Sequence, residues 1–307
     1  STGVRNTIIG GSAGDALTTG SYNIAIGYQS LSTEDTGNKS VAIGYDALKD
    51  QNYDGDAYNV AIGFAAGENV STGTNNNIIG GLAGYALTTG GQNIVIGRQA
   101  LTTEDTGSRN IAIGDRALFD ANYDGNGYNV AVGHDAGDDI STGIQNTVIG
   151  GNAAKANITT GSNNIVIGYN SDASAADVSN EITLGDANIS AFRCADDSIS
   201  TLSDRRDKSN IKDSEFGLDF INSIRPVEFT WDYRPEHMSE VKQGKTRIGF
   251  IAQELQEAMP NDENEILDLV YDIDENRIEA KYSKLVPILT KAIQELSAEV
   301  KELKKQI

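Results

Sequence analysis

The sequence contains little cysteine, proline, aromatic residue or positive charge. Its one cysteine, Cys194, excludes an intramolecular disulfide framework and argues against a metal cluster. We expect this cysteine to be a small buried thiol. No stretch is apolar for long enough to form a membrane span. No secretory signal opens the chain, and it begins at Ser1 rather than Met, so we expect a further part upstream.

Acidic residues outnumber basic ones, 44 to 24, for a formal charge of −20. Residues 1–202 hold 8 basic and 22 acidic residues (net −14), and residues 203–307 hold 16 and 22 (net −6). Nucleic-acid binding depends on neutralising phosphates, and anionic membranes attract polybasic segments. The excess of acidic residues therefore argues against nucleic acid and anionic membranes as partners. A high net charge also keeps a long fibre soluble.

A glycine-terminated unit, Asn-x-(Ala/Ile/Val)-Ile-Gly, recurs along the first two thirds of the chain. Its glycines are Gly10, Gly27, Gly44, Gly63, Gly80, Gly97, Gly114, Gly133, Gly150, Gly168 and Gly185. The steps are 17, 17, 19, 17, 17, 17, 19, 17, 18 and 17, and residues 8–77 match residues 78–147 at 43 of 70 positions. A fixed period with a duplicated block predicts a solenoid.

One unit, Asn23–Gly27, shows how a coil should form. Alternation places Ile24 and Ile26 on one face and Ala25 on the other. We expect the Ile/Val rows inside the coil and the Ala rows near a threefold axis between chains, because a single thin coil has little interior of its own. The fold class is then mostly β: a parallel β-solenoid or β-roll trimeric shaft, followed by an α+β domain that ends in a coiled-coil helix.

Two of the repeat units read Ser40-Val41-Ala42-Ile43-Gly44-Tyr45-Asp46-Ala47 and Asn110-Ile111-Ala112-Ile113-Gly114-Asp115-Arg116-Ala117. In these units the repeats resemble the heads of trimeric autotransporter adhesins of the YadA type. The resemblance covers roughly residues 4–190 and implies a left-handed parallel β-roll with three chains to a head. At about 4.8 Å per stacked strand, eleven coils make a rod of roughly 50 Å.

Acidic residues recur in register with the repeat, among them Glu34 and Glu104. Paired carboxylates in a groove would fit a glycosidase, but acids locked to the register of a repeat are more typical of a solvated face. The shaft is therefore read as a spacer or adhesin rather than a turnover enzyme.

Two loops share the spacing D-x-N-x-D-G, which collects oxygen ligands around Ca²⁺. The candidate ligands are Asp50, Asn52, Asp54, Asp120, Asn122 and Asp124. The closing acid of an EF-hand is absent, since Ala61 and Ala131 occupy the twelfth position. Both loops lie in 19-residue coils, so an inserted Asn/Asp/Gly turn explains them without metal, and we favour this interpretation. No cofactor is required, and Ca²⁺ stays a candidate.

We divide the chain into a shaft (1–194), a linker (195–202) and a C-terminal domain (203–307). In this domain the pattern predicts helices at 217–224 and 253–259, strands at 226–233 and 247–252, and a hairpin over 268–274 and 277–282. The last segment has an a/d heptad pattern formed by Val286, Leu289, Ile293, Leu296, Val300, Leu303 and Ile307. Its β-branched a positions favour two strands, but we expect the eleven coils to impose a trimer.

A series of short segments marks the C-terminal domain: Ser203-Asp204-x-Arg206-x-Lys208, Gly217-Leu218, Ile224-Arg225-Pro226-Val227-x-Phe229, Gly249-Phe250-Ile251-Ala252-Gln253-Glu254, Tyr282, and Lys291-Ala292-Ile293-Gln294-Glu295-Leu296. In these segments the domain resembles the intramolecular chaperone auto-processing domain of phage tail spikes, tail fibres and endosialidases. The order of the segments spans the whole of residues 203–307.

This resemblance implies a self-cleaving Ser-Lys peptidase. Ser203 would attack the carbonyl of Leu202, and Lys208 would act as general base. Asp204, Gln253 or backbone N–H groups would support the oxyanion. His237 lies outside any motif, so a triad is not expected. The alternative is that Ser203 only caps a helix and Lys208 is solvated.

Together these features predict a homotrimeric phage tail fibre or spike with its own folding chaperone. It would be assembled in the host cytoplasm and located in the virion, with a host cell-surface receptor as partner, and it would lose residues 203–307 on cleavage. The alternatives are a bacterial trimeric surface adhesin fragment and a tail spike that degrades host glycans.

Overall fold

The computed structural model describes residues 2–156, 158–195, 200, 202–232, 243–259, 264–274 and 277–307. They form two compact units, a shaft unit, Ser1–Asp186, and a C-terminal unit, Ala187–Ile307. None of the helices in these ranges is long and apolar enough to cross a membrane.

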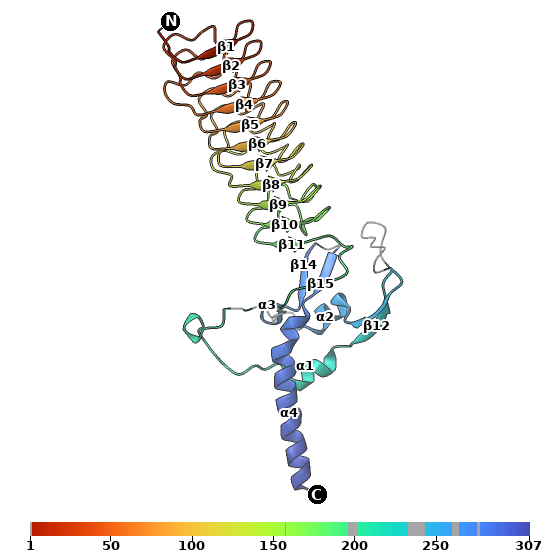
Figure 1. Ribbon diagram of the computed structural model, residues 1–307. Coiled ribbons are helices and arrows are strands. Elements are labelled where there is room, and N and C mark those ends of the chain that lie inside the picture. Colours follow the sequence, from red (N-terminus) through yellow and green to blue (C-terminus); the bar gives the residue numbers. More distant parts are fainter. Residues whose placement is uncertain are drawn as a thin grey trace. The chain divides into compact units, whose positions relative to one another are not determined.

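The shaft unit is a parallel β-solenoid with one three-residue strand per coil (Figure 1). The strands are β1 (Thr7–Ile9), β2 (Ile24–Ile26), β3 (Val41–Ile43), β4 (Val60–Ile62), β5 (Asn77–Ile79), β6 (Ile94–Ile96), β7 (Ile111–Ile113), β8 (Val130–Val132), β9 (Thr147–Ile149), β10 (Ile165–Ile167) and β11 (Ile182–Leu184). They pair in sequence order in one sheet. Each strand ends one residue before a repeat glycine, which confirms the predicted solenoid and its period.

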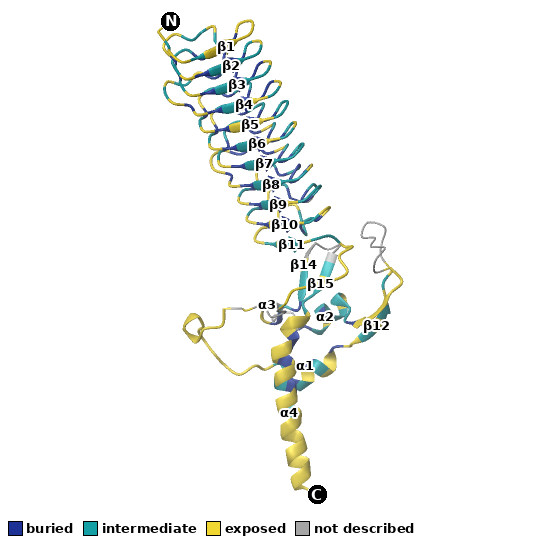
Figure 2. Ribbon diagram, in the orientation of Figure 1, coloured by how far each residue is buried: buried dark blue, intermediate teal, exposed yellow. Residues whose placement is uncertain are grey.

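The prediction of which strand face is interior is wrong. The middle residue of β2, Ala25, is fully buried, whereas Ile24 and Ile26 are only partly buried. The middle residue is buried in every strand from β2 to β10, whereas the end strands β1 and β11 are more exposed (Figure 2). Leu31 and Leu48, from the part of the coil that follows the strand, are fully buried in the same core. The inward strand position holds alanine in several coils but also the fully buried Ile78 and Val95, so this face is interior whatever the size of its residue.

A ladder of buried asparagines runs along the shaft just before the strands. The Oδ1 atom of Asn93 accepts the backbone N–H of Asn110 at 2.9 Å, and its Nδ2 atom donates to the carbonyl of Gly107 at 3.0 Å. Asn76 and Asn110 occupy equivalent positions in the coils before and after. Buried backbone groups at a corner need partners, and the ladder supplies them once per coil.

The ladder has one serine, and a glutamine compensates for it. Ser40 is too short to reach the next coil, so Gln51 lies beside it and donates to its hydroxyl at 2.9 Å. The Oε1 atom of Gln51 accepts from Asn59, also at 2.9 Å. In the second 70-residue block the ladder residue is Asn110, and Tyr123 contacts it in place of the glutamine. The polar spine is therefore continuous through both blocks.

The repeat glycines are required by close backbone approach. Gly114 has φ +140°, and a Cβ there would lie 2.1 Å from the carbonyl oxygen of Gly133 in the next coil. A side chain cannot fit at that distance, and the conformation itself is one that glycine tolerates best. This explains why glycine marks every coil.

The C-terminal unit is a small α+β assembly. Its elements are a 3₁₀ turn (Arg205–Asp207), α1 (Leu218–Ser223), β12 (Val227–Thr230), β13 (Thr246–Gly249), α2 (Ala252–Ala258), α3 (Asn264–Leu267), β14 (Val270–Asp274), β15 (Arg277–Ala280), a second 3₁₀ turn (Tyr282–Lys284) and α4 (Leu285–Lys305). Strands β12 and β13 pair antiparallel, as do β14 and β15. The predicted helices, strands and hairpin are confirmed with shifted ends, and α3 was not predicted.

The core of this unit joins α1, α2 and the start of α4. Phe220, Leu255, Leu269 and Ile288 are among its buried members. Glu295 of α4 accepts the backbone N–H of Leu218 at 2.7 Å and so satisfies a free donor at the first turn of α1. A Cβ at Gly217 would lie 2.2 Å from that carboxylate. The two sequence segments Gly217-Leu218 and Gln294-Glu295 therefore form one contact.

Candidate processing site at Ser203

A short turn brings Ser203 and Lys208 together. Asp204 is the N-cap of the 3₁₀ turn Arg205–Asp207, and its side chain accepts the backbone N–H of Arg206 at 2.8 Å. The Arg206 guanidinium also donates to the same carboxylate, at 2.7 Å. The turn reverses the chain enough for Lys208 Nζ to donate to Ser203 Oγ at 2.6 Å. The cap is therefore Asp204, and the alternative in which Ser203 caps the helix is wrong.

Ser203 and Lys208 lie at the surface of the single chain. Ser203 and Lys208 are exposed, and the side chain of Leu202, whose carbonyl Ser203 would attack, is 97% exposed. A lysine acts as a general base near neutral pH when burial favours its neutral form. The single chain therefore supplies the contact between nucleophile and base, but it does not supply their desolvation.

The residues expected to support an oxyanion are not gathered around this pair. Asp204 is engaged by Arg206, and its carboxylate is an acceptor, so it cannot stabilise an oxyanion. The hydrogen bond from Arg206 holds the pKa of Asp204 below its ordinary value. Gln253 is exposed on α2, and among the described residues no hydrogen bond joins it to Ser203 or Lys208. His237 lies outside the described residues.

The heptad stripe of α4 faces away from the core of its unit. Leu285, Ile288 and Ala292 are the buried residues of this helix. The predicted a/d residues are instead exposed, from 40% at Val300 to 63% at Ile293 within the helix. The helix is confirmed, whereas its pairing with other helices stays a prediction. Cys194 is exposed, so its expected burial is wrong.

The two D-x-N-x-D-G loops are closed by hydrogen bonds between coils. Asp54 accepts from the hydroxyl of Thr36, and Asp124 accepts from that of Thr106 at 2.8 Å. The backbone N–H groups of Asp50, Asn52, Asp120 and Asn122 donate to carbonyls of the following coil. In the described part of the chain, no group of three or more His, Cys, Asp or Glu residues is placed to hold a metal ion. These contacts fit a structural turn, and Ca²⁺ binding stays a prediction.

Glu34 and Glu104 are buried, which corrects their interpretation as a solvated face. Both are fully inaccessible, and each accepts the N–H of the glycine three residues later at 2.6 Å. Glu34 also accepts from the Gln51 amide at 3.0 Å. Glu104 has Ala121 at the corresponding place, and burial raises the pKa of its carboxyl above the ordinary value. They anchor turns inside the solenoid and cannot reach a substrate.

Comparison with known families gives a match in the C-terminal part of the chain. The profile of the chaperone of endosialidase family, a peptidase family by its name, matches residues 203–262 and so begins at Ser203. No curated protein matches the chain significantly, and no solved structure does so either. The likeness of the shaft to YadA-type heads therefore stays a prediction, while residues 203–262 resemble an endosialidase chaperone.

Proposed function

We propose that the chain is part of a phage tail fibre or spike whose residues 203–307 act as an intramolecular chaperone and are then released by self-cleavage. One observation carries this proposal: the match to the endosialidase chaperone begins at Ser203, and Ser203 Oγ accepts a hydrogen bond from Lys208 Nζ at 2.6 Å. The shaft unit would remain in the virion and contribute to attachment at a host surface receptor.

Two apolar surfaces support assembly into a homotrimer. The outward Ile and Val rows of the sheet leave Ile62, Ile96 and Ile167 between 37% and 38% exposed. The heptad stripe of α4 is a second such surface, and its 3-4 spacing is typical of helices that pack together. Soluble monomers rarely expose long continuous apolar strips. A parallel trimer would bury both strips with like segments of the other chains.

Cleavage would follow from assembly. Ser203 Oγ attacks the Leu202 carbonyl carbon while Lys208 Nζ takes the hydroxyl proton, and the acyl group passes from the Ser203 nitrogen to its oxygen. The freed amine is protonated, and water then hydrolyses the ester, leaving a Leu202 carboxylate and a free Ser203. Because the pair is exposed in the single chain, we infer that a neighbouring copy supplies the desolvation that lets Lys208 act as a base.

The test follows freshly expressed full-length chain by mass spectrometry and light scattering over time. We expect a 105-residue fragment beginning at Ser203, at a rate that rises with protein concentration. Ser203→Ala should abolish it and Lys208→Ala should slow it severely. Lys212→Ala, which removes a nearby exposed lysine paired with Glu215, is the matched control. Unchanged cleavage in Ser203→Ala, or a fragment with another N-terminus, would refute the assignment.

A further inference from the structure

The outward face of the sheet has two edge rows that differ from its apolar centre. The leading edge row consists of the residue two positions before each strand, such as Tyr22 before β2. The trailing edge row consists of the residue two positions after each strand, such as Tyr28. Both tyrosines are 48% exposed. The outward residues of each strand, mostly Ile and Val, lie between these edges.

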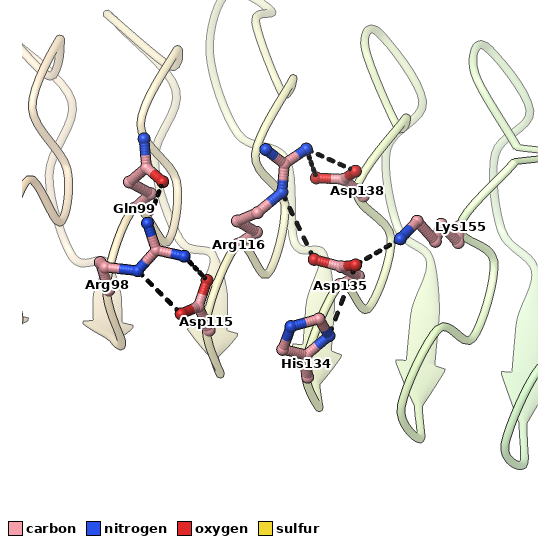
Figure 3. Close-up of polar contacts among 8 residues, drawn as sticks. All are labelled: Arg98, Gln99, Asp115, Arg116, His134, Asp135, Asp138 and Lys155. Atoms are coloured by element: carbon pink, nitrogen blue, oxygen red, sulfur yellow. Dashed lines mark hydrogen bonds and ion pairs between the residues drawn. The ribbon is translucent and has the colours of Figure 1, made fainter.

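The trailing edge row changes chemistry between the two 70-residue blocks. In the first block Tyr28, Tyr45 and Phe64 stack in sequence, with ring centroids 5.2 and 5.3 Å apart. In the second block the equivalent positions hold Arg98, Asp115 and His134. Arg98 donates two hydrogen bonds to Asp115, at 2.9 and 3.0 Å (Figure 3).

The leading edge row carries cations that lie over tyrosine rings, and one of them, Lys39, also pairs with Asp56 at 2.7 Å. Lys39 lies 4.9 Å from the ring centroid of Tyr58, and Arg109 lies 5.5 Å from that of Tyr128. The third cation, Arg5, lies over Tyr22. This row contains no acidic residue. The two edges of one face are therefore chemically different, and each has a periodic pattern along the shaft.

Symmetry decides which edges meet. A rotation axis parallel to the shaft, with the sheet faces turned toward it, places the leading edge of one copy against the trailing edge of the next, coil for coil. This holds for two copies or three. An antiparallel pair would instead oppose leading edge to leading edge, so that Arg109 could not meet Asp115.

In register, the edges complement one another at the charged coils. Arg109 of one copy faces Asp115 of the next, and Lys39 faces the ring of Tyr45. Ion pairs and cation–π contacts of this kind are favourable. A slip of one coil places Arg109 opposite either Arg98 or His134, which removes the ion pair and in the first case opposes two cations. Like-charge contacts of that kind select against wrong partners.

We propose that these edge rows set the register of parallel copies, with the Arg109–Asp115 contact between copies as its main charged element. The occupant of the sheet face is a second copy of this chain, so the inference rests on the assembly proposed above. A slip of a whole block would place Lys39 opposite Asp115, which is also favourable. The edges therefore select register within a block, and exclusion of the block slip is left to residues 203–307.

Cysteine cross-linking tests this in the full chain. In a Cys194→Ser background, Lys39→Cys with Tyr45→Cys should form disulfides between copies under mild oxidant, because disulfides need close Cα atoms and this variant keeps Arg109 and Asp115. Lys39→Cys with Tyr28→Cys probes a one-coil slip, and Lys39→Cys alone probes an antiparallel pair centred on β3. One coil adds about 4.8 Å, so we expect the in-register pair to react at least about tenfold faster than either control.

A charge variant gives an independent readout. Arg109→Glu opposes Asp115 and should lower the temperature at which the assembly dissociates. Arg5→Glu faces Gly11 and should leave it unchanged. Oligomers of normal size in which all cysteine variants react equally, or in which Lys39→Cys alone reacts fastest, would overturn the register proposal while leaving assembly intact. A Cys194→Ser chain that stays monomeric by light scattering would overturn both.

Discussion

Replacing Asn93 with alanine tests whether the asparagine ladder holds the coils together. The change removes the acceptor for the Asn110 N–H and the donor to the Gly107 carbonyl, at 2.9 and 3.0 Å. Both groups lie in the buried interior, where an unsatisfied donor or acceptor costs about 1–3 kcal/mol. We therefore expect Asn93→Ala to lower the free energy of unfolding by about 2–6 kcal/mol.

The measurement is denaturant unfolding of the full chain by circular dichroism, with hydrogen exchange at the Asn110 amide as a local probe. Gln92→Ala, an exposed change one residue away, is the matched control and should stay within about 0.5 kcal/mol of the unmodified chain. Asn93→Asp keeps the Oδ1 acceptor but turns the donor into an acceptor facing the Gly107 carbonyl. Its loss of stability should shrink as acidic pH protonates the new carboxylate.

Two results would refute this reasoning. One is an Asn93→Ala chain no less stable than Gln92→Ala, which would mean that water or a small backbone shift replaces the lost hydrogen bonds. The other is an Asn93→Asp chain whose stability relative to the unmodified protein does not depend on pH.

Three further predictions concern the shaft. Burial raises the pKa of Glu104 in the folded chain. In the unfolded chain this carboxyl ionises near its ordinary pKa of about 4.3, so the folded shaft should lose stability as the pH rises above that value. Glu104→Gln should remove that loss, so the denaturation midpoint should fall from pH 4 to pH 8 in the unmodified chain but not in the variant. An equal fall in both proteins would count against this prediction. Gly114→Ala should strongly destabilise the chain, because the new Cβ would lie 2.1 Å from a carbonyl oxygen, whereas Gly81→Ala meets no atom within 4 Å and should be tolerated; similar melting temperatures for the two would contradict the packing argument. Because hydrogen bonds between coils close the loops 50–56 and 120–126, we expect a chelator to leave the melting temperature unchanged, and a clear drop restored by Ca²⁺ would show a metal site instead.

The elements of the C-terminal unit were predictable because local signals agree with one another. The alternation around Phe229 and the helical periodicity of residues 253–259 correspond to β12 and α2. The five-residue spacing of Ser203 and Lys208 is short enough for one turn to bring them together. Their exposure was not predictable, since it depends on which other segments, or other chains, pack against the turn.

The sequence by itself determined where each coil begins and ends, because the period of the repeat is a property of the chain in one dimension. It also determined that the two faces of each strand differ. Only the tertiary structure decided which face is inside. That choice depends on how the strand packs against the rest of its coil, where Leu31 lies in the same core as Ala25, and it holds even where the inward residue is the larger Ile78. The same closure buried Glu34 and Glu104, because an acidic side chain on a turn faces solvent or core according to how the next coil stacks on it.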